Sequence, residues 1–393
     1  MTTPAILQIL PALDEGGIEQ GTLEIADSIV RAGGKAIVAS AGGRLEIQLR
    51  HSGVEHICLP KIGSRNPIYL ARNIRTVRQI LEDRKINLVH ARSRIPAWVT
   101  RFACQSNKIP FVTTWHGVHA NTFPGKKLYN AVLASGDRVI AISQFIAKRL
   151  EDEYHVDAHR LRIIPRGVNT QRFSPEAVNG QRIHQLAEKW RIPINSPVIL
   201  VPGRITAWKG QGFVLQALSR LSISRPELKW CCIFVGSTSA HQRYVRNLLA
   251  QTDRFNLSHR VHFAGHCDDV PAALALSTMV IVPSLKPEPF GRVIIEAQAM
   301  CKPVIVTQHN TATETVQKGI TGLCVPPRDP LALAHAIAWI LKAPHSSLSK
   351  MTTAARNMVI ARYTTSAMQH ATLRVYDELL QTSLASTFVD HTS

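Results

Sequence analysis

Residues 287–300 have the sequence PEPFGRVIIEAQAM and carry two carboxylates, Glu288 and Glu296, eight positions apart. Glu288 lies in a Pro/Gly turn. The run from Val293 to Met300 contains no helix breaker and repeats its apolar residues at helical spacing. The stretch therefore predicts a turn that leads into a helix N-terminus, where free backbone N–H groups and the positive end of the helix dipole face the turn.

The spacing of the two glutamates admits two interpretations. Eight residues of helix return to nearly the same face, which would place the carboxylates roughly 10–12 Å apart along the axis. Such a pair suits a ligand with hydroxyl groups at both ends. Two ordinary surface glutamates would have the same spacing. The rest of the chain must therefore distinguish a ligand-binding pair from two surface residues.

Length and composition predict a folded protein with two domains. A chain of 393 residues exceeds one ordinary hydrophobic core. Hydrophobic residues make up 45% of it, and we expect neither a membrane-spanning segment nor a secretory signal. The seven cysteines are scattered and lack C-x-x-C spacing, which predicts a reducing compartment without zinc or disulfides.

Positive charge is the outlier of the composition. A formal net charge of +19 predicts a polyanionic partner, which could be nucleic acid, an anionic membrane surface or a phosphorylated substrate. A helix predicted over 67–84 has one apolar stripe, and Arg72, Arg75 and Arg78 occupy the remaining face. That face could rest on an anionic membrane or could be a solvated basic surface.

Residues of the kinds found in binding sites follow several predicted strands of the first half. A Gly16-Gly17 turn follows the strand at 5–10, Arg92 and Arg94 follow the strand at 87–90, and His116 follows the strand at 110–114. Ligands of open α/β sheets gather at the carboxyl ends of strands, so these arginines are candidates for holding an anionic group. A glycine pair used for packing and a structural histidine are the alternatives.

The pattern restarts in the second half with a strand at 197–202. Gly203 and Arg204 follow it, and Lys209 and Gly210 come five positions later. An arginine and a lysine in one strand-to-helix loop can hold adjacent phosphates without a metal ion. The sequence contains no P-loop motif, and the Asp268-Asp269 pair predicts a helix cap rather than a metal site.

These patterns predict an α/β protein with two Rossmann-like parallel-sheet domains, 1–180 and 181–364, that face a common cleft. We expect the helix in the segment 365–393 to cross back onto the first domain.

Five groups of residues match the motifs of one known family: Gly16-Gly17-Ile18-Glu19, Thr114-Trp115-His116-Gly117, Ile164 to Asn169 with Phe173, Gly203-Arg204 with Lys209-Gly210, and the Glu288 and Glu296 pair. On these residues the chain resembles the retaining glycosyltransferases of family 4, which have the GT-B fold, over nearly its whole length. Within that family it is most similar to the lipopolysaccharide-core mannosyltransferases of α-proteobacteria. Arg166 fits that branch, although most of the family has asparagine there, whereas Asn169 departs from the usual aspartate.

The resemblance implies a role for each matching residue. The first domain would take the acceptor, and the second would bind the nucleotide sugar. The implied catalytic residues are Glu288, His116, Arg204 and Lys209. The implied donor-binding residues are Gly17, Gly203, Arg204, Lys209, Glu288, Pro289, Phe290, Gly291 and Glu296, with Glu296 on the ribose and Glu288 on the sugar. The residues expected at the acceptor are Arg92, Arg94 and His116.

The resemblance further implies retaining transfer by front-face substitution, without a metal or other cofactor. The expected reaction moves mannose from GDP-mannose onto the Kdo–lipid A inner core of lipopolysaccharide. Because that acceptor is phosphorylated and membrane-bound, we expect a cytoplasmic protein, peripheral on the inner membrane through its basic N-terminal domain. A UDP-sugar donor with another cell-envelope glycan or lipid acceptor is the main alternative.

Two other functions fit the sequence less well. A nucleic-acid-binding protein would explain the charge, but no helix-turn-helix, zinc-finger or aromatic-basic signature accompanies it, so we expect no nucleic-acid partner. A sugar-nucleotide epimerase would share the two-domain architecture. The Glu288 and Glu296 spacing, together with Arg204 and Lys209, favours transfer.

Overall fold

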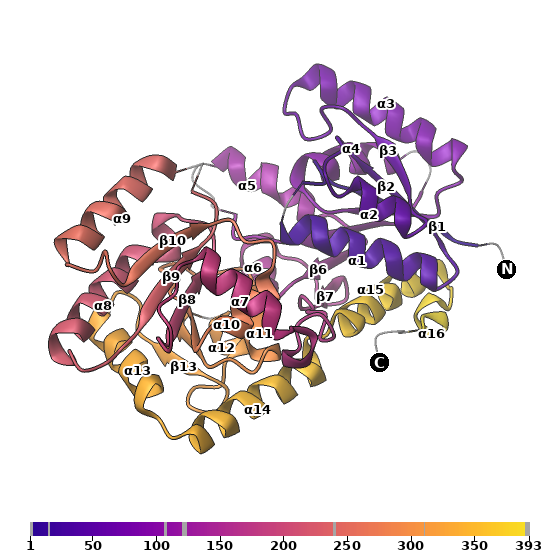
Figure 1. Ribbon diagram of the computed structural model, residues 1–393. Coiled ribbons are helices and arrows are strands. Elements are labelled where there is room, and N and C mark those ends of the chain that lie inside the picture. The colour runs from indigo at the N-terminus through magenta and orange to yellow at the C-terminus, as the bar shows by residue number, and fades with distance from the viewer. Residues whose placement is uncertain are drawn as a thin grey trace. The chain divides into compact units, whose positions relative to one another are not determined.

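The computed structural model describes residues 3–14, 16–105, 108–119, 124–238, 241–309 and 311–389 (Figure 1). The chain forms two compact units. The first runs to Gly167 and includes the segment from Thr365 onward, and the second is Val168–Thr364. Residues 168–180, assigned to the first domain from the sequence, thus belong to the second unit. No helix in the described ranges is long and apolar enough to cross a membrane.

The first unit is built on a parallel sheet, seven-stranded over the described residues, in the order β3-β2-β1-β4-β5-β6-β7. The direction of strand addition reverses between β1 and β4, so a ligand crevice is expected at their carboxyl ends. The strands are β1 (Ala5–Ile9), β2 (Lys35–Ser40), β3 (Glu55–Cys58), β4 (Leu88–Ala91), β5 (Phe111–Trp115), β6 (Arg138–Ala141) and β7 (Leu161–Ile163). The helices are α1 (Gly17–Arg31), α2 (Glu46–His51), α3 (Pro67–Asp83), α4 (Arg94–Cys104), α5 (Pro124–Ala131), α6 (Gln144–Tyr154), α15 (Thr365–Leu380) and α16 (Leu384–Thr387).

Strand β1 shows why both faces of this sheet are covered by helices. Its side chains alternate between the faces. Ala5, Leu7 and Ile9 join one core with residues of α3 and α4, while Ile6 joins a second core with α1 and α15. A strand buried on both faces is expected to be mainly apolar, and every residue of this strand except Gln8 is apolar.

The C-terminal helix α15 packs against α1, so the predicted return of the chain to the first domain is confirmed (Figure 1). Leu373 and Tyr376 are fully buried in the core that α15 shares with α1. The last helix therefore completes the first unit although it follows the second in sequence.

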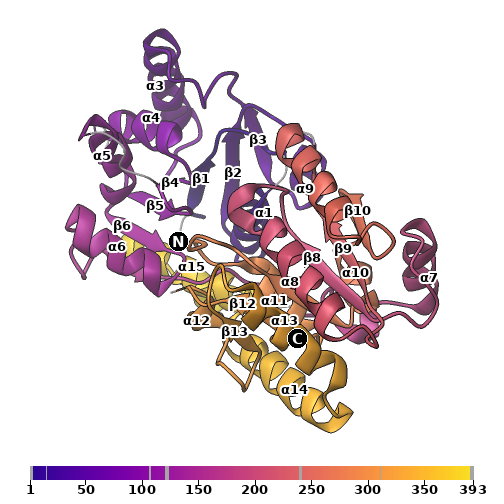
Figure 2. The same ribbon diagram turned by 90° about the vertical axis from the view of Figure 1, so that its left-hand side faces the viewer.

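The second unit repeats the architecture, and the prediction of two Rossmann-like parallel-sheet domains is confirmed (Figure 2). Its sheet, six-stranded within the described segments, has the order β10-β9-β8-β11-β12-β13, with the reversal between β8 and β11. The strands are β8 (Val198–Pro202), β9 (Cys231–Val235), β10 (Val261–Gly265), β11 (Met279–Val282), β12 (Val304–Thr307) and β13 (Leu323–Val325). The helices are α7 (Gly180–Lys189), α8 (Gln211–Ser224), α9 (Gln242–Arg254), α10 (Val270–Leu276), α11 (Arg292–Ala299), α12 (Ala312–Thr315), α13 (Pro330–Lys342) and α14 (His345–Arg362).

Two local predictions are confirmed at helices α3 and α10. Val77 is buried on the apolar side of α3, whereas Arg72 and Arg75 are exposed. Asp269 caps α10, because its carboxylate accepts from the Ala272 N–H at 3.1 Å. Asp269 also pairs with Arg182 at 2.7 Å, which holds the pKa of that carboxyl below its usual value.

Candidate functional site

In the second unit, the loops that follow β8 and β11 are tied together at the carboxyl end of the sheet. The Leu285 N–H donates to the Trp208 carbonyl at 2.7 Å. Gly210 has a φ of +79°, and a Cβ there would lie 2.0 Å from the Pro283 carbonyl oxygen. Only glycine allows this approach, which occurs at the strand-order reversal where α/β sheets bind ligands.

Lys209 and Glu288 meet across these two loops. Lys209 Nζ lies 2.7 Å from Glu288 Oε1, and the side chains are 17% and 14% exposed. The Ser284 hydroxyl also bonds to Glu288 Oε1, and Lys209 Nζ lies 4.6 Å above the Trp208 ring. Two residues predicted for the donor site, 79 positions apart in sequence, thus form one half-buried ion pair.

Gly203 and Arg204 begin the same loop. Gly203 has a φ of +142°, and a Cβ on the neighbouring Gly236 would lie 2.0 Å from the Gly203 carbonyl oxygen. Arg204 is exposed, and its carbonyl accepts from Gln211 Nε2 at 3.1 Å. The backbone of this loop is held firmly, while the Arg204 guanidinium remains accessible to a ligand.

Helix α11 begins at Arg292, so the predicted turn at Glu288 that leads into a helix is confirmed. Gly291 has a φ of +85°, so the chain from Glu288 to Gly291 is not helical. The estimate that helix geometry sets the separation of Glu288 and Glu296 was therefore wrong, because only the four steps from Arg292 to Glu296 follow the helix. Glu296 lies one turn inside α11, where its carboxylate pairs with Arg292 at 3.5 Å.

The residues between the two glutamates fix the turn. Phe290 is 4% exposed, and its ring packs edge-on against Tyr363 at 5.8 Å between centroids. With Phe290 anchored, Pro289 and Gly291 direct the backbone into the N-terminus of α11. A cavity of about 10 Å³, room for a single water, is lined by Ser284, Glu288 and Phe290 among others.

In the first unit, Gly17 is the first residue of α1 and follows β1, one of the two strands at the reversal. Gly16 before it has a φ of +145°, so the turn needs glycine. The N-terminus of α1 therefore presents its backbone N–H groups at the carboxyl end of the sheet.

Arg92 and His90 form a buried polar layer beneath this end of the sheet. Arg92 is 3% exposed and its Nε donates to Gln8 Oε1 at 2.7 Å. His90 Nδ1 lies 2.7 Å from the Tyr376 hydroxyl, and its Nε2 lies 2.7 Å from Thr114 Oγ1. Burial lowers the pKa of His90 well below its usual value, with the charge of Arg92 as a further cause. The C-terminal helix thus reaches the strand ends through Tyr376.

His116 lies above this layer against Arg166. The Arg166 Nη2 atom is 2.9 Å from His116 Nδ1. Nε2 of His116 is inaccessible to solvent and has no hydrogen-bond partner among the described residues. Burial, followed by the charge of Arg166, holds the pKa of His116 well below its usual range. Because a guanidinium can only donate, the Nδ1 atom of His116 accepts from Arg166 and carries no proton in this arrangement.

Arg94, the other expected acceptor residue, lies at the start of α4. Its Nη1 donates to Asn130 Oδ1 at 3.0 Å, and its guanidinium lies 5.3 Å from the Tyr129 ring centroid. Arg94 is half-buried, in contrast to the fully buried Arg92.

Several residues that contact the predicted site residues were not themselves predicted from the sequence. Gln8 is the one polar residue of the buried β1 strand, which is a signal that sequence alone could have offered. Tyr376 and Ser284 gave no such signal, because their contacts join segments distant in sequence or within an irregular loop. Arg166 was noted only for its resemblance to one branch of the family.

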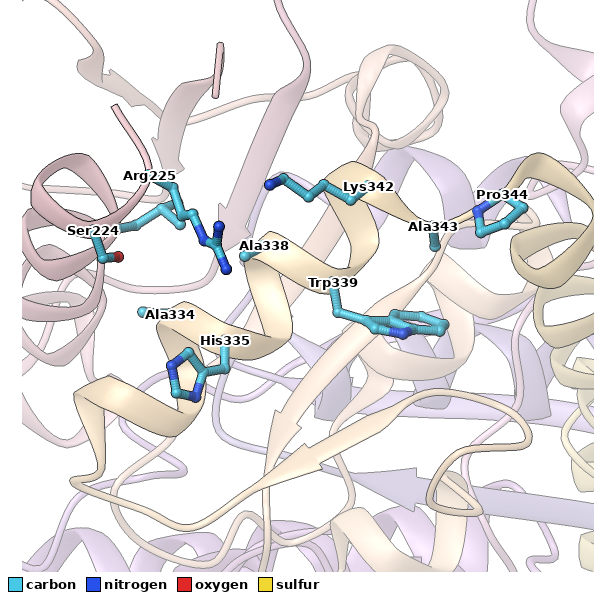
Figure 3. Close-up of a pocket in the computed structure, with 10 residues that line it drawn as sticks. Ser224, Arg225, Ala334, His335, Ala338, Trp339, Lys342, Ala343 and Pro344 are labelled. Atoms are coloured by element: carbon cyan, nitrogen blue, oxygen red, sulfur yellow. The ribbon is translucent and has the colours of Figure 1, made fainter. Parts of the chain in front are cut away.

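A further pocket of about 510 Å³ lies between α8 and α13 (Figure 3). Figure 3 shows Arg225, His335 and Lys342 around it, with Trp339 at its edge. None of the predicted site residues lines it. Because α8 and α13 start at the carboxyl end of the sheet, their last turns lie at the amino end, away from the candidate site.

Two family models together match most of the chain. Residues 15–172 match the model described as Glycosyltransferase Family 4, and residues 183–358 match the model described as Glycosyl transferases group 1. The crystal structure of a glycosyltransferase from Rickettsia africae is 33% identical, with a TM-score of 0.89, over 98% of this chain and 100% of that one.

More distant relatives share the fold or part of the sequence. The Anabaena protein Alr3699/HepE, solved in complex with UDP-glucose, is 22% identical with a TM-score of 0.81, over 95% of this chain and 99% of that one. A D-inositol 3-phosphate glycosyltransferase from Acidothermus cellulolyticus is 28% identical over 276 residues, which cover 65% of this chain and 59% of that protein. The chain thus spans less than two thirds of the length of that curated relative.

Proposed function

This chain belongs to the glycosyltransferases and has their GT-B fold, and from that premise we propose that it moves mannose from GDP-mannose onto a Kdo–lipid A inner core. The observation that carries the donor side of this proposal is the Lys209–Glu288 pair at the strand-order reversal of the second unit. A carboxylate suits sugar hydroxyls, and a neighbouring ammonium suits a phosphate.

On the donor side, we assign the residues by charge and position. Arg204 and Lys209 would neutralise the diphosphate, Glu288 and the Phe290 and Gly291 amides would bind the sugar, and Glu296 would bind the ribose. This assignment needs no metal ion, because two cations already lie in the loop that would meet the phosphates. Gly17 remains a proposed donor-binding residue, because the N-terminus of α1 presents free backbone N–H groups.

The proposed chemistry is retaining, front-face substitution. The bond from the anomeric carbon to the phosphate oxygen breaks, and a bond from that carbon to the acceptor oxygen forms on the same face. The acceptor's proton passes to the departing phosphate oxygen. Charge develops on the diphosphate, so Arg204 and Lys209 would provide the main electrostatic stabilisation.

On the acceptor side, we propose that the first unit meets a phosphorylated glycolipid at an anionic membrane surface. Arg72 and Arg75 are exposed on α3 without an ion-pair partner among the described residues, and Ile68 beside them is 75% exposed. An exposed basic face with apolar residues suits an anionic bilayer. Arg94 and His116 would contact the acceptor, and the buried Arg92 would contribute charge from below.

A second candidate is the same transfer with a UDP-sugar donor and another cell-envelope glycan or lipid acceptor. The Anabaena protein of the same fold binds UDP-glucose, and the Acidothermus relative is named for an inositol phosphate acceptor. Both candidates use the same Lys209 and Glu288 chemistry, so they differ only in base, sugar and acceptor.

A donor screen tests the proposal. Purified protein is incubated with Kdo–lipid A and, in turn, GDP-mannose, UDP-glucose, UDP-galactose or UDP-N-acetylglucosamine, with and without EDTA, and products are read by mass spectrometry. We expect a hexose to be added from GDP-mannose at the same rate with EDTA present. Preference for a UDP-sugar would replace the first candidate by the second, and loss of activity in EDTA would reject metal-free transfer.

A further inference from the structure

Arg166 contacts His116 in a way that fixes where the histidine proton lies. A guanidinium has five N–H donors and no acceptor, so the atom that it bonds must supply a lone pair. Arg166 Nη2 lies 2.9 Å from His116 Nδ1, which makes Nδ1 the acceptor. A neutral imidazole carries its proton on one nitrogen only, so the proton of His116 lies on Nε2.

The surroundings of His116 also oppose a second proton. Protonation would place an N–H on Nδ1 against the guanidinium of Arg166 and destroy the hydrogen bond. Burial opposes a charge on His116, and the described groups that lower its pKa further are cationic or basic. These groups are His90 in β4, Arg92 directly after β4, His119 in the same loop as His116, and Arg166 after β7. An acidic group, Glu19 of α1, interacts with Arg166.

Gly21 explains how Arg166 reaches this position. It lies within α1, where glycine destabilises a helix by about 1 kcal/mol relative to alanine. A Cβ at Gly21 would lie 2.0 Å from Arg166 Nη1, so any larger residue would displace the guanidinium. Arg166 is itself only 6% exposed and has little room to move aside. The position of the Arg166 guanidinium therefore depends on the absence of a side chain at Gly21.

We propose that Arg166, for which Gly21 leaves room, is a positioning residue that holds His116 in the Nε2–H tautomer, so that Nε2 can donate a hydrogen bond to the substrate. Nε2 is inaccessible to solvent and has no partner within the part of the chain that the structure describes. A buried donor without a partner is costly, and an oxygen of the bound acceptor would satisfy it. His116 then donates a hydrogen bond and does not remove a proton from the acceptor.

The tautomer follows from geometry alone, whereas its use in transfer rests on the proposed function. In front-face substitution the departing phosphate takes the acceptor's proton, so a histidine that cannot act as a base is compatible with the chemistry. If the donor screen fails, the tautomer of His116 can still be as proposed. If the tautomer proves to be different, the assignment of the donor is not affected.

Nitrogen NMR of protein labelled with ¹⁵N-histidine tests the tautomer directly. The His116 signals are identified by their loss in a His116→Asn variant. We expect Nδ1 to be unprotonated and Nε2 protonated, without change between pH 8 and pH 6. In Arg166→Met, and in Gly21→Ala as a second variant that leaves both side chains intact, we expect mixed tautomers or titration in that range. Arg166→Lys, which keeps a cationic donor, should partly restore the wild-type spectrum.

Transfer kinetics test the consequence. We expect Arg166→Met and Gly21→Ala to lower kcat/KM roughly ten- to hundredfold, as for loss of a hydrogen bond to a charged group. Arg162→Met is the matched control, because Arg162 pairs with Glu378 and does not contact His116. A protonated Nδ1 in the wild type, or unchanged His116 signals in both variants, would overturn the proposal.

Discussion

Glu288 is held by Lys209 and Ser284, and this arrangement is compatible with its proposed role in binding sugar hydroxyls. Lys209 balances its charge, and the pair is only half-buried, so exchange of one partner for a sugar hydroxyl does not strand a charge in the core. Lys209 is in turn free to follow a phosphate. The same two residues therefore serve the resting protein and the proposed complex.

Replacement of Glu288 by glutamine tests its proposed role. Glu288→Gln keeps the shape of the side chain but removes the charge that accepts hydroxyl hydrogens and balances Lys209. We expect transfer to fall by a factor on the order of 10² or more, with the fold retained by circular dichroism.

The chain offers a matched control for this substitution. Glu227 pairs with Lys342 at 3.0 Å on the exposed surface of the second unit. Glu227→Gln removes a carboxylate from a similar lysine pair and should leave transfer unchanged. Equal activity of the two variants would remove Glu288 from the site.

At the scale of elements, the loops after β8 and β11 act as one unit because their backbones touch. The Leu285 to Trp208 hydrogen bond and the approach of Gly210 to Pro283 join them. Strand order alone makes β8 and β11 neighbours, but this contact sets the distance between Lys209 and Glu288.

Gly210→Ala tests this junction. A Cβ would lie 2.0 Å from the Pro283 carbonyl at a φ of +79°, and we expect a loss of about 1–3 kcal/mol in the free energy of unfolding. Gly212→Ala is the control two residues on, where the nearest atom to a Cβ is 3.4 Å away. Urea denaturation should show Gly212→Ala unchanged or more stable, and equal losses in both variants would refute the junction.

The fold of the whole molecule was largely predictable from sequence, because buried parallel strands are continuous apolar runs and the polar residues after them mark the carboxyl ends. The second unit's strand predicted at 197–202, which the structure places at Val198–Pro202, followed from this rule. Contacts between distant segments were not predictable. The residues adjacent in sequence to Gly21 and Arg166 give no indication that the missing side chain of Gly21 leaves space for the Arg166 guanidinium.

Local backbone geometry limited the prediction of the site. The sequence-based prediction used a helical period for all eight steps from Glu288 to Glu296. The positive φ of Gly291 breaks that period, because the helix begins only at Arg292. The boundary near residue 180 was placed at a turn-rich segment, whereas the chain passes into the second unit at Val168. In both places a glycine or a short irregular segment determined the backbone path, which the periodicity of the flanking residues did not predict.

The central claim is that Lys209 and its loop bind the diphosphate of a nucleotide sugar. Calorimetric titration of the purified protein with GDP and with UDP, without divalent ions, measures it. We predict that Lys209→Met binds the preferred nucleotide roughly ten- to hundredfold more weakly than the wild type. Lys342→Met, which removes the lysine of the surface pair, should bind as the wild type does. Unaltered affinity in Lys209→Met would contradict the account.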